Sequence, residues 1–482
     1  MPAIRNNLVS SFKLASKEPP TPDSAQFIAD EIQALRTGVR KLRVAPTVSA
    51  PEIRQRLESY TFAHQTPLPD ALRDVAGMLR QWTLHATHPR YFGLFVPGTH
   101  EAGIWADALA ALYNPQVGAW WHAPAANEIE IHTLKFLANV IGFEAKSAQF
   151  TSGGSEANLT ALLAAIAAAY PNASEEGVGE AAAQGSVYIS SESHHSIEKA
   201  SRIAGLGKRV LRIVPCNSRH QMDIVALQEA VDMDVVAGRK PIMIVGTLGT
   251  TTSGAIDDLA AIGTIARAND AWFHVDAAWG GAAGFSPKLR SLLDGISEAD
   301  SVTWDAHKWL SVPMGAGMFF SRRAGVLNQI FGVNAAYVPK KLDEGDDLYL
   351  TSLQWSRRFI GLKVFLTLAV AGRDGVAARI ERQLAVADYL RDRLGTAGWI
   401  VVNDSPLPLV CFTHPALESA ELVNEVAQNV VSGGRAWISA ATLPEGRVLR
   451  ACITHDDTSN ADIDVLFEEL ERARSKTSPK PQ

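Results

Sequence analysis

The sequence predicts an α/β protein in which a mostly parallel sheet is covered by helices. From about residue 150 the chain alternates short β-rich runs with helical stretches, and the runs are continuously apolar. Strands have this composition when both faces of a parallel sheet are buried. The 482 residues, 47% of them hydrophobic and 20% charged, are typical of a globular protein of two or three structural units with a large core.

The predicted elements follow one another in a regular order. Helical spacing of apolar residues predicts helices over 24–42 and 51–58, and a loop with prolines and glycines follows at 88–100. Strands are predicted at 186–193, 208–215, 241–250, 271–279, 301–309 and 316–321, with helices near 155–169, 195–205, 223–237 and 257–268. We therefore expect an N-terminal helical segment (1–90), a large α/β domain (91–371) and a small C-terminal α+β domain (372–482).

Charge and composition exclude several classes of function. The net charge is −6, the pI is near 6.1, and lysines and arginines are scattered, so no nucleic-acid partner is expected. Three distant cysteines form neither a disulfide framework nor a zinc pattern, and they fit a reducing compartment. The N-terminus lacks the apolar core of a signal peptide, and the most apolar helical run is too short to span a bilayer. We expect a cytoplasmic protein with no membrane partner and no metal.

Charged residues stand where two of the predicted strands end. The run "AWFHVDAAW" carries Asp276, and the run "SVTWDAHKW" carries Asp305, His307 and Lys308. A buried, unpaired charge is costly, so each group needs a partner. Ligands of such sheets bind outside the carboxyl ends of the strands. The sequence therefore predicts a ligand site at this edge of the sheet.

The segment "FTSGGSEANLTALLAAI" reads as a strand end, a glycine turn and a helix start. The free N–H groups of that helix start and the hydroxyls of Ser152 and Ser155 suit a phosphate. An ordinary capping turn built on Ser155 and Glu156 is an equal alternative. A hydrolase with Ser155 as its nucleophile is a much weaker alternative. Ala157 stands where the nucleophile motif G-x-S-x-G has its second glycine, and no Asp–His pair stands out downstream.

His194 in "SESHHSIEKAS" ends another predicted strand. A histidine there can stack on a flat ring, ligate a metal, or be an ordinary polar residue; His195 and Glu198 lie one helical turn apart, but two ligands make weak evidence for a metal. The hydroxyl run "TLGTTTSGAIDDL" by itself reads as a threonine-rich turn.

Together with Lys308 and Asp276, these individually weak signals indicate one kind of site. A lysine at the end of a covered strand is suited to attack a carbonyl group. A buried carboxylate is the usual partner of the pyridinium nitrogen in a pyridoxal phosphate site. A phosphate turn, a ring-stacking histidine, a carboxylate and a lysine, in that order on successive strand ends, predict this cofactor.

At these residues the sequence resembles the group II pyridoxal-phosphate decarboxylases, which include aromatic-L-amino-acid (DOPA), glutamate and cysteine sulfinate decarboxylases. The resemblance runs from "HPRYFGLF" to "RVLRACIT", and "HVDAAWGG" and "DAHKWLSVPMGAGM" are its most specific parts. It implies the fold type I PLP-dependent transferase-like homodimer, with an N-terminal segment that packs against the partner. The apolar faces of the N-terminal helices also predict a homodimer, since they are too far from the sheet pattern in the sequence for us to expect that one chain covers them.

The resemblance also implies roles for individual residues. Lys308 is expected to bind pyridoxal 5'-phosphate covalently, Asp276 to hold the ring nitrogen, and His194 to stack on the ring. The further cofactor-binding positions implied by the family are Gly154 and Ser155 at the phosphate, and Thr251, Ala278, Asp305 and His307 around the same site. "NAAYVPKKLDEGDD" is similar to the family's lid loop, which implies that Tyr337 is the proton donor; its polar composition suits a lid. An aromatic loop anchor is an equal alternative for Tyr337.

The expected reaction is decarboxylation of an L-amino acid to its amine, with an aromatic substrate favoured. Five residues are candidates for the substrate side: Tyr91, Phe92, Phe95, Trp120 and Trp121. The sequence departs from the aromatic subgroup at two places. It has Gly93-Leu94-Phe95 after the "HP" element, and Gly118 stands in place of a bulky ring. Acidic and diamino amino acids therefore remain alternative substrates. A phospho-amino-alcohol lyase or an aldehyde-forming enzyme is a further alternative; Tyr337 argues against the latter.

Overall fold

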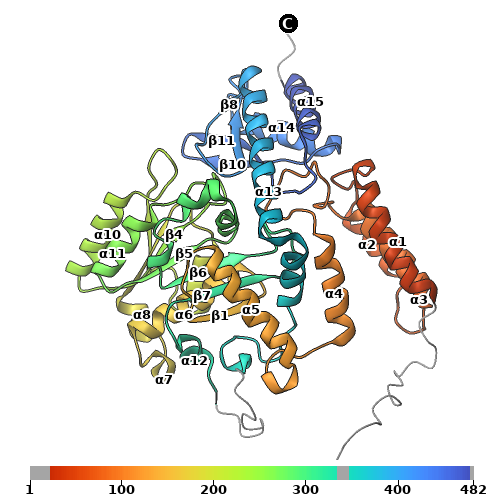
Figure 1. Cartoon of the computed structure of the whole chain (residues 1–482). Coiled ribbons are helices and arrows are strands. Elements are labelled where there is room, and N and C mark those ends of the chain that lie inside the picture. Colours follow the sequence, from red (N-terminus) through yellow and green to blue (C-terminus); the bar gives the residue numbers. More distant parts are fainter. Residues whose placement is uncertain (1–21, 334–346, 478–482) are drawn as a thin grey trace, which may run out of the picture. The chain divides into compact units, whose positions relative to one another are not determined.

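The computed structural model describes residues 22–333 and 347–477, and Figure 1 shows the chain. Its contacts divide the chain into two compact units, residues 1–85 and 86–482. The predicted division at residues 90 and 371 stays a prediction. In the described part of the chain, no helix combines the length and the apolar character that crossing a membrane requires.

The first unit is helical. It contains α1 (Pro22–Gly38), a 3-10 turn η1 (Val39–Lys41), α2 (Ala50–Leu57) and α3 (Leu68–Trp82). The sequence did not predict α3 because its prolines read as breaks, yet a proline in the first turn of a helix loses no hydrogen bond. Arg80 pairs with Glu31 and Arg56 with Asp74, so ion pairs join α3 to both other helices.

A seven-stranded sheet forms the centre of the second unit, in the order β1-β7-β6-β5-β4-β2-β3. Its strands are β1 (Ser147–Thr151), β2 (Gly185–Ser190), β3 (Leu211–Val214), β4 (Lys240–Thr247), β5 (Trp272–Asp276), β6 (Ser301–Asp305) and β7 (Gly317–Ser321). Only β7 runs antiparallel to its neighbours within this sheet. The predicted mostly parallel sheet is confirmed, and β1 is the strand that leads into the glycine turn.

Helices cover both faces of this sheet (Figure 1). One apolar core contains side chains of α6 (Gly154–Ala169), α9 (Ser196–Ile203) and α12 (Val326–Phe331). The other face packs against α5 (Pro124–Val140), α10 (Ile224–Val236), α11 (Leu259–Ala268) and α13 (Gly361–Thr396). The structure adds α4 (Glu101–Tyr113), and it places α7 (Ala173–Glu176) and α8 (Gly179–Gln184) between α6 and β2. Short 3-10 turns are η2 (Trp120–His122), η3 (Gly280–Phe285), η4 (Pro287–Leu293), η5 (Ile296–Glu298) and η6 (Leu348–Leu350).

A second, antiparallel sheet has its own apolar core. Its strand order is β10-β11-β9-β8, formed by β8 (Ile400–Val401), β9 (Leu409–Thr413), β10 (Ser439–Leu443) and β11 (Gly446–Cys452). The C-terminal half of α13 packs there with α14 (Ala420–Gly433) and α15 (Asn460–Thr477). Gly372 interrupts α13 with φ 67°, a backbone conformation that a side chain would strain.

Candidate active site

The carboxyl ends of β1, β2, β4, β5 and β6 meet at one edge of the central sheet, because these strands run in the same direction. Asp276 is the last residue of β5 and Asp305 the last of β6. Ala278 links the two ends: its N–H donates to Asp276 Oδ1 at 3.1 Å, and its carbonyl accepts from the Asp305 N–H at 2.8 Å. The predicted meeting of charged residues at this edge is therefore seen in the fold.

Asp276 is a buried carboxylate whose two oxygens both accept hydrogen bonds. Asn158 of α6 donates through Nδ2 to Asp276 Oδ2 at 2.9 Å, and the Ala278 N–H serves the other oxygen. A carboxylate offers about four lone-pair positions, so two protein donors leave capacity for another one. This arrangement fits a donor such as a protonated ring nitrogen.

Lys308 lies beside Asp305 and is half-buried. Its Nζ is 3.2 Å from Asp305 Oδ2, whereas Asp305 Oδ1 is buried and has no hydrogen-bond partner in the described part of the chain. His307 Nδ1 accepts from the Ala316 N–H at 3.2 Å, and burial lowers the pKa of its imidazole. An amine and a carboxylate oxygen are thus left for a ligand at the sheet edge.

The glycine turn before α6 packs against Asp305 and His307. A Cβ atom at Gly154 would lie 2.8 Å from Asp305 Oδ2, so this position must be a glycine for the turn to approach so closely. Ser152 is used inside the turn, where its N–H and hydroxyl both donate to Glu156 at 2.8 and 2.6 Å. Helix α6 has no side-chain cap, and Ser155 is exposed at its first turn. Free N–H groups and a hydroxyl at a helix start are suited to an anion.

His194 follows β2 and joins the same electrostatic environment. Its Nδ1 is 2.8 Å from Ser196 Oγ and 3.2 Å from the Ser196 N–H. Surrounding protein atoms lower the pKa of His194 even though part of the ring is exposed; the charge of Asp276 opposes this effect and that of Lys308 adds to it. A neutral imidazole at this place is able to stack on a flat ring.

The other predicted residues have separate outcomes. Thr251 is half-buried, and its carbonyl accepts from Arg450 Nε at 3.0 Å, a bond that joins the sheet edge to β11. Tyr337 lies outside the described residues. Ser155 has no histidine partner in the part of the chain that the structure describes, so the hydrolase alternative gains no support there. Residues 22–333 and 347–477 hold no group of three side chains suited to a metal ion.

Aromatic residues lie close to this edge. Phe95 stacks on Trp279 with ring centroids 4.3 Å apart, and Trp279 Nε1 donates to the Gly249 carbonyl at 2.7 Å. Phe92 is fully buried in the core of the second sheet, so the suggestion that it faces substrate is wrong. Gly93 has to be a glycine because a Cβ atom there would lie 2.2 Å from the Trp437 ring. Trp437 thus occupies the space that a larger residue 93 would need.

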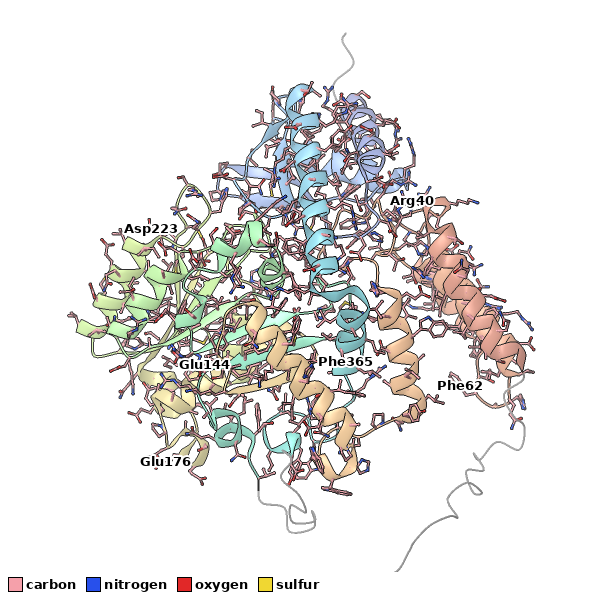
Figure 2. The ribbon with its side chains drawn as sticks, viewed as in Figure 1. Arg40, Phe62, Glu144, Glu176, Asp223 and Phe365 are labelled. Atoms are coloured by element: carbon pink, nitrogen blue, oxygen red, sulfur yellow. The ribbon has the colours of Figure 1, made fainter. Side chains whose placement is uncertain are left out.

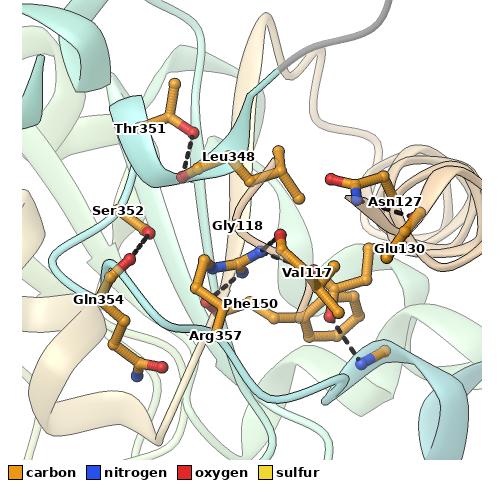
Figure 3. A network of polar contacts seen from close by, with 12 residues as sticks. Val117, Gly118, Asn127, Glu130, Phe150, Leu348, Thr351, Ser352, Gln354 and Arg357 are labelled. Carbon is orange, nitrogen blue, oxygen red and sulfur yellow. Dashed lines mark hydrogen bonds and ion pairs between the residues drawn. The ribbon is translucent and has the colours of Figure 1, made fainter. Parts of the chain in front are cut away.

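Sequence reasoning missed a buried ion pair that supports the glycine turn (Figure 3). Arg357 Nη1 lies 3.1 Å from Glu130 Oε2 and donates to the Val117 carbonyl, while Nη2 donates to the Phe150 carbonyl of β1. The other oxygen of Glu130 accepts from the Gly361 N–H at 3.0 Å. No local motif could have paired residues that are 227 positions apart.

Comparison with known proteins identifies the family of the chain. Residues 51–414 match the model of the pyridoxal-dependent decarboxylase conserved domain, which is most of the chain. The chain belongs to the pyridoxal-dependent decarboxylase family. It is an enzyme, a pyridoxal-phosphate-dependent amino acid decarboxylase, and its cofactor is pyridoxal 5'-phosphate.

Individual decarboxylases resemble the chain over most of its length. An aromatic-L-amino-acid decarboxylase of Bacillus atrophaeus is 31% identical over 79% of this chain and 80% of that protein. Tryptophan decarboxylase 2 of Oryza sativa subsp. japonica is 28% identical over 85% of this chain and 86% of its own. The structure of Oryza sativa TDC with PLP and tryptamine covers 96% of this chain and 100% of its own, with a TM-score of 0.91 and 24% identity, which shows the shared fold. Mouse CSAD has a TM-score of 0.85 and 26% identity, with 94% of this chain and 97% of its own covered.

Proposed function

We propose that the chain decarboxylates an aromatic L-amino acid to its amine, as a homodimer. The observation that carries the site assignment is that Lys308, Asp276 and His194 follow or end strands at the same edge of the sheet, beside an uncapped helix start. The spare oxygen of Asp305 and the lone pairs of Asp276 fit a cationic or N–H-bearing ligand.

Each residue has a defined task in this proposal. Pyridoxal phosphate, when bound, supplies an electron-withdrawing ring that weakens the bond between the α-carbon and the carboxylate. Lys308 binds the cofactor covalently, and Asp276 keeps a proton on the ring nitrogen through a charge-assisted hydrogen bond, a type worth roughly 1.5–3 kcal/mol. His194 lies against the ring. Gly154 and Ser155 hold the phosphate at the start of α6, where the helix dipole favours negative charge.

The remaining predicted residues complete the site. Thr251, Ala278, Asp305 and His307 surround the cofactor in this proposal, and the Ala278 backbone fixes the spacing of the two strand ends. Tyr337 is proposed to donate a proton to the α-carbon after CO₂ has left. The carboxylate of Asp347, the last residue of that loop sequence, accepts from the Trp120 N–H at 3.0 Å.

An aromatic substrate has two kinds of support. The relatives include an aromatic-L-amino-acid decarboxylase and a tryptophan decarboxylase, and the pair Phe95–Trp279 lies next to Ala278 in the fold. One observation favours an acidic substrate as a second candidate. Arg450 is buried over the Phe95 ring, and its Nη2 has no hydrogen-bond partner in the described residues. A substrate carboxylate would be its natural partner.

A panel of L-amino acids assayed for CO₂ and amine tests the proposed substrate class. Tryptophan, tyrosine and DOPA represent aromatic substrates, and glutamate, aspartate, cysteine sulfinate and 2,4-diaminobutyrate represent the alternatives. Turnover confined to the aromatic set supports the proposal, and turnover of the acidic set alone overturns it in favour of the Arg450 reading. Borohydride reduction followed by peptide mapping locates the lysine that holds the cofactor.

The homodimer rests on apolar surface in both units. In the first unit Ile28, Leu57, Val75 and Leu79 are exposed, and Phe62, labelled in Figure 2, is 91% exposed. In the second unit α4 presents a stripe of exposed Trp105, Leu109, Leu112 and Tyr113. Exposed apolar surface of this kind marks protein–protein contacts.

Truncation tests the assembly separately from the chemistry. Removal of residues 1–60 is expected to cost solubility or dimerisation, measured by light scattering during size-exclusion chromatography. An active, well-behaved monomer after this truncation would refute the homodimer. We also propose a cytoplasmic location, which the three free cysteines support because such thiols suit a reducing compartment.

A further inference from the structure

A chain of buried hydrogen bonds runs behind the candidate cofactor site. Trp272 Nε1 lies 2.8 Å from Ser301 Oγ, which lies 2.8 Å from His274 Nδ1. His274 Nε2 is 3.1 Å from Asn158 Oδ1 and 3.4 Å from Thr303 Oγ1. The five residues belong to β5, β6 and α6, and all of them are buried.

Asn158 divides this chain into two branches that both reach proposed cofactor-binding groups. One hydrogen of Nδ2 goes to Asp276 Oδ2 at 2.9 Å, and the other goes to Ser196 Oγ at 2.8 Å. Ser196 Oγ in turn lies 2.8 Å from His194 Nδ1. A single amide therefore contacts the carboxylate directly and the imidazole through one hydroxyl.

The chemistry of the chain's ends determines the direction of every bond between them. An indole N–H only donates, and an ionised carboxylate only accepts. The Asn158 amide must then present Nδ2 to Asp276, because the flipped amide would place two acceptors 2.9 Å apart. Its Oδ1 needs a donor, which His274 Nε2–H provides. From the other end, Ser301 accepts from Trp272 and donates to His274 Nδ1, which leads to the same tautomer.

The same reasoning reaches His194. Ser196 Oγ accepts from Asn158, so its own proton is free to be donated to His194 Nδ1. The Ser196 N–H also points to His194 Nδ1, which confirms this nitrogen as an acceptor. The proton of a neutral His194 must then lie on Nε2. Burial lowers the pKa of His274 to about 4, which agrees with an uncharged link in the chain.

We infer that Asn158 is a positioning residue that holds the Asp276 carboxylate and fixes His194 in its Nε2–H tautomer through one directional hydrogen-bond chain. This inference rests on the proposed roles of Asp276 and His194. No motif of the sequence marked Asn158, which lies within a largely apolar helix. In this role Asn158 orients the Asp276 carboxylate so that it can accept a hydrogen bond from the ring nitrogen.

Cofactor binding to the cofactor-free protein tests the inference without reference to turnover. The dissociation constants of pyridoxal phosphate and of its analogue with carbon in place of the ring nitrogen are compared. Their ratio, the preference for pyridoxal phosphate, isolates the contact of the ring nitrogen. Asp276→Asn should abolish the preference for pyridoxal phosphate and sets the full scale. Asn158→Ala should reduce the preference by about tenfold, the loss expected for one hydrogen bond to a charged group. Where the alanine variant does not fold, Asn158→Asp is measured instead and should lose the preference as well, since it sets an oxygen against Asp276.

Two matched variants separate positioning from general loss of structure. Thr160→Val removes a buried hydroxyl of the same helix that bonds only to the Glu156 carbonyl at 2.9 Å, and its preference should stay within twofold of wild type. Ser196→Ala cuts only the His194 branch, so it should keep the preference. In protein labelled with ¹⁵N-histidine, the same variant keeps the Ser196 N–H as a donor to His194 Nδ1, so the Nε2–H signature of His194, assigned with His194→Gln, should weaken without disappearing.

The outcomes distinguish this inference from the proposed function. If Asp276→Asn leaves the preference unchanged, the ring-nitrogen role of Asp276 fails and the proposed site fails with it. If Asp276→Asn abolishes the preference while the Asn158 variants keep it within twofold of wild type, the site stands and the positioning role of Asn158 is overturned. A His194 proton on Nδ1 in the wild-type protein would overturn the directional chain.

Discussion

Two clusters of buried polar side chains lie in the larger unit, and they differ in how fully their hydrogen-bonding groups are used. In the first, Arg357 and Glu130 neutralise each other, and the Val117, Phe150 and Gly361 backbone supplies further partners. In the second, Asp305 keeps one oxygen without a partner in the described residues, and the Lys308 amine is half-buried.

This difference separates a structural cluster from a ligand site. Buried polar groups are normally satisfied, and a group that is left over needs an explanation. The Arg357 cluster joins β1 to the starts of η2 and α13, and its polar groups are used within the protein. At the sheet edge the spare acceptors and the amine belong to the proposed cofactor site. Mutations in the first cluster should therefore change stability, and mutations in the second should change chemistry.

Loss of the lysine should give the largest effect on chemistry. Lys308→Ala is expected to lower CO₂ release to the uncatalysed background and to abolish borohydride-dependent fixation of the cofactor. The fold should persist because Lys308 is not fully buried. Lys363→Met is the matched control: its Nζ donates to the Met314 carbonyl at 2.8 Å, and burial lowers its pKa, but it has no role in the proposed cofactor site. Cofactor fixed to another lysine in Lys308→Ala would contradict the assignment.

The residues of this site were largely accessible from the sequence, whereas those that support it were not. Asp276, Asp305 and Lys308 lie at the ends of apolar runs. A buried strand that ends at a charged residue can be recognised in the sequence alone. Asn158 makes its decisive contact with Asp276, 118 positions away in the sequence. Arg357 contacts Glu130 and Phe150, which lie 227 and 207 positions away. Such contacts depend on packing, and no spacing rule reports them.

The fold shows the same division. Six strands of the central sheet were predictable because their sequences are largely apolar runs, and their ends differ from the prediction by a few residues. The sequence indicated only the end of β1, before the glycine turn. Helices α3, α4 and α5 were not predicted: prolines begin or precede two of them, and short connections separate them from a loop rich in glycine and proline. The antiparallel placement of β7 was also hidden, since composition does not encode strand direction.

The proposed proton donor sharpens the comparison from the side of chemistry. Tyr337→Phe should bind cofactor and substrate normally and form amine about 10²–10⁴-fold more slowly, the usual contribution of a positioned general acid. Amine is measured per CO₂ released, in air and under nitrogen. Tyr349→Phe serves as the control, because Tyr349 packs on Trp355 just after the same loop. Amine formation at the wild-type rate in Tyr337→Phe would assign the proton to another group, with His194 or His195 next in line.

The structural cluster should respond in stability. Glu130→Gln leaves Arg357 with a buried, uncompensated charge, and the loss of one partner of such a pair costs about 3–5 kcal/mol of unfolding free energy. Replacement of both partners, Glu130→Leu with Arg357→Met, should cost less, since no charge is left unpaired. Urea unfolding measures both variants, and the cofactor content per folded molecule should remain that of the wild type. A normal stability with lost cofactor would place this pair in the site instead.

The smallest expected effect is a pH dependence of stability that comes from His274, behind the proposed site. Burial lowers the pKa of His274 from 6.5 to about 4 in the folded chain. Below pH 6.5 His274 therefore binds a proton in the unfolded chain but not in the folded chain. The stability that His274 contributes is complete above this pH and is lost as the pH falls toward 4. Between pH 7 and pH 5.5 this loss amounts to about 1 kcal/mol.

His274→Gln isolates this term, because the glutamine amide is able to donate to Asn158 and to accept from Ser301 without titrating. Urea unfolding of the cofactor-free wild type and variant at both pH values gives a difference of differences, in which His194 and His307 cancel since both proteins contain them. The wild type should lose about 1 kcal/mol more than the variant on acidification. An equal loss in both proteins would mean that His274 takes up a proton in the folded state as readily as in the unfolded one. The directional chain through Asn158 would then break at its centre, because a protonated imidazole donates from both nitrogens and no longer accepts from Ser301.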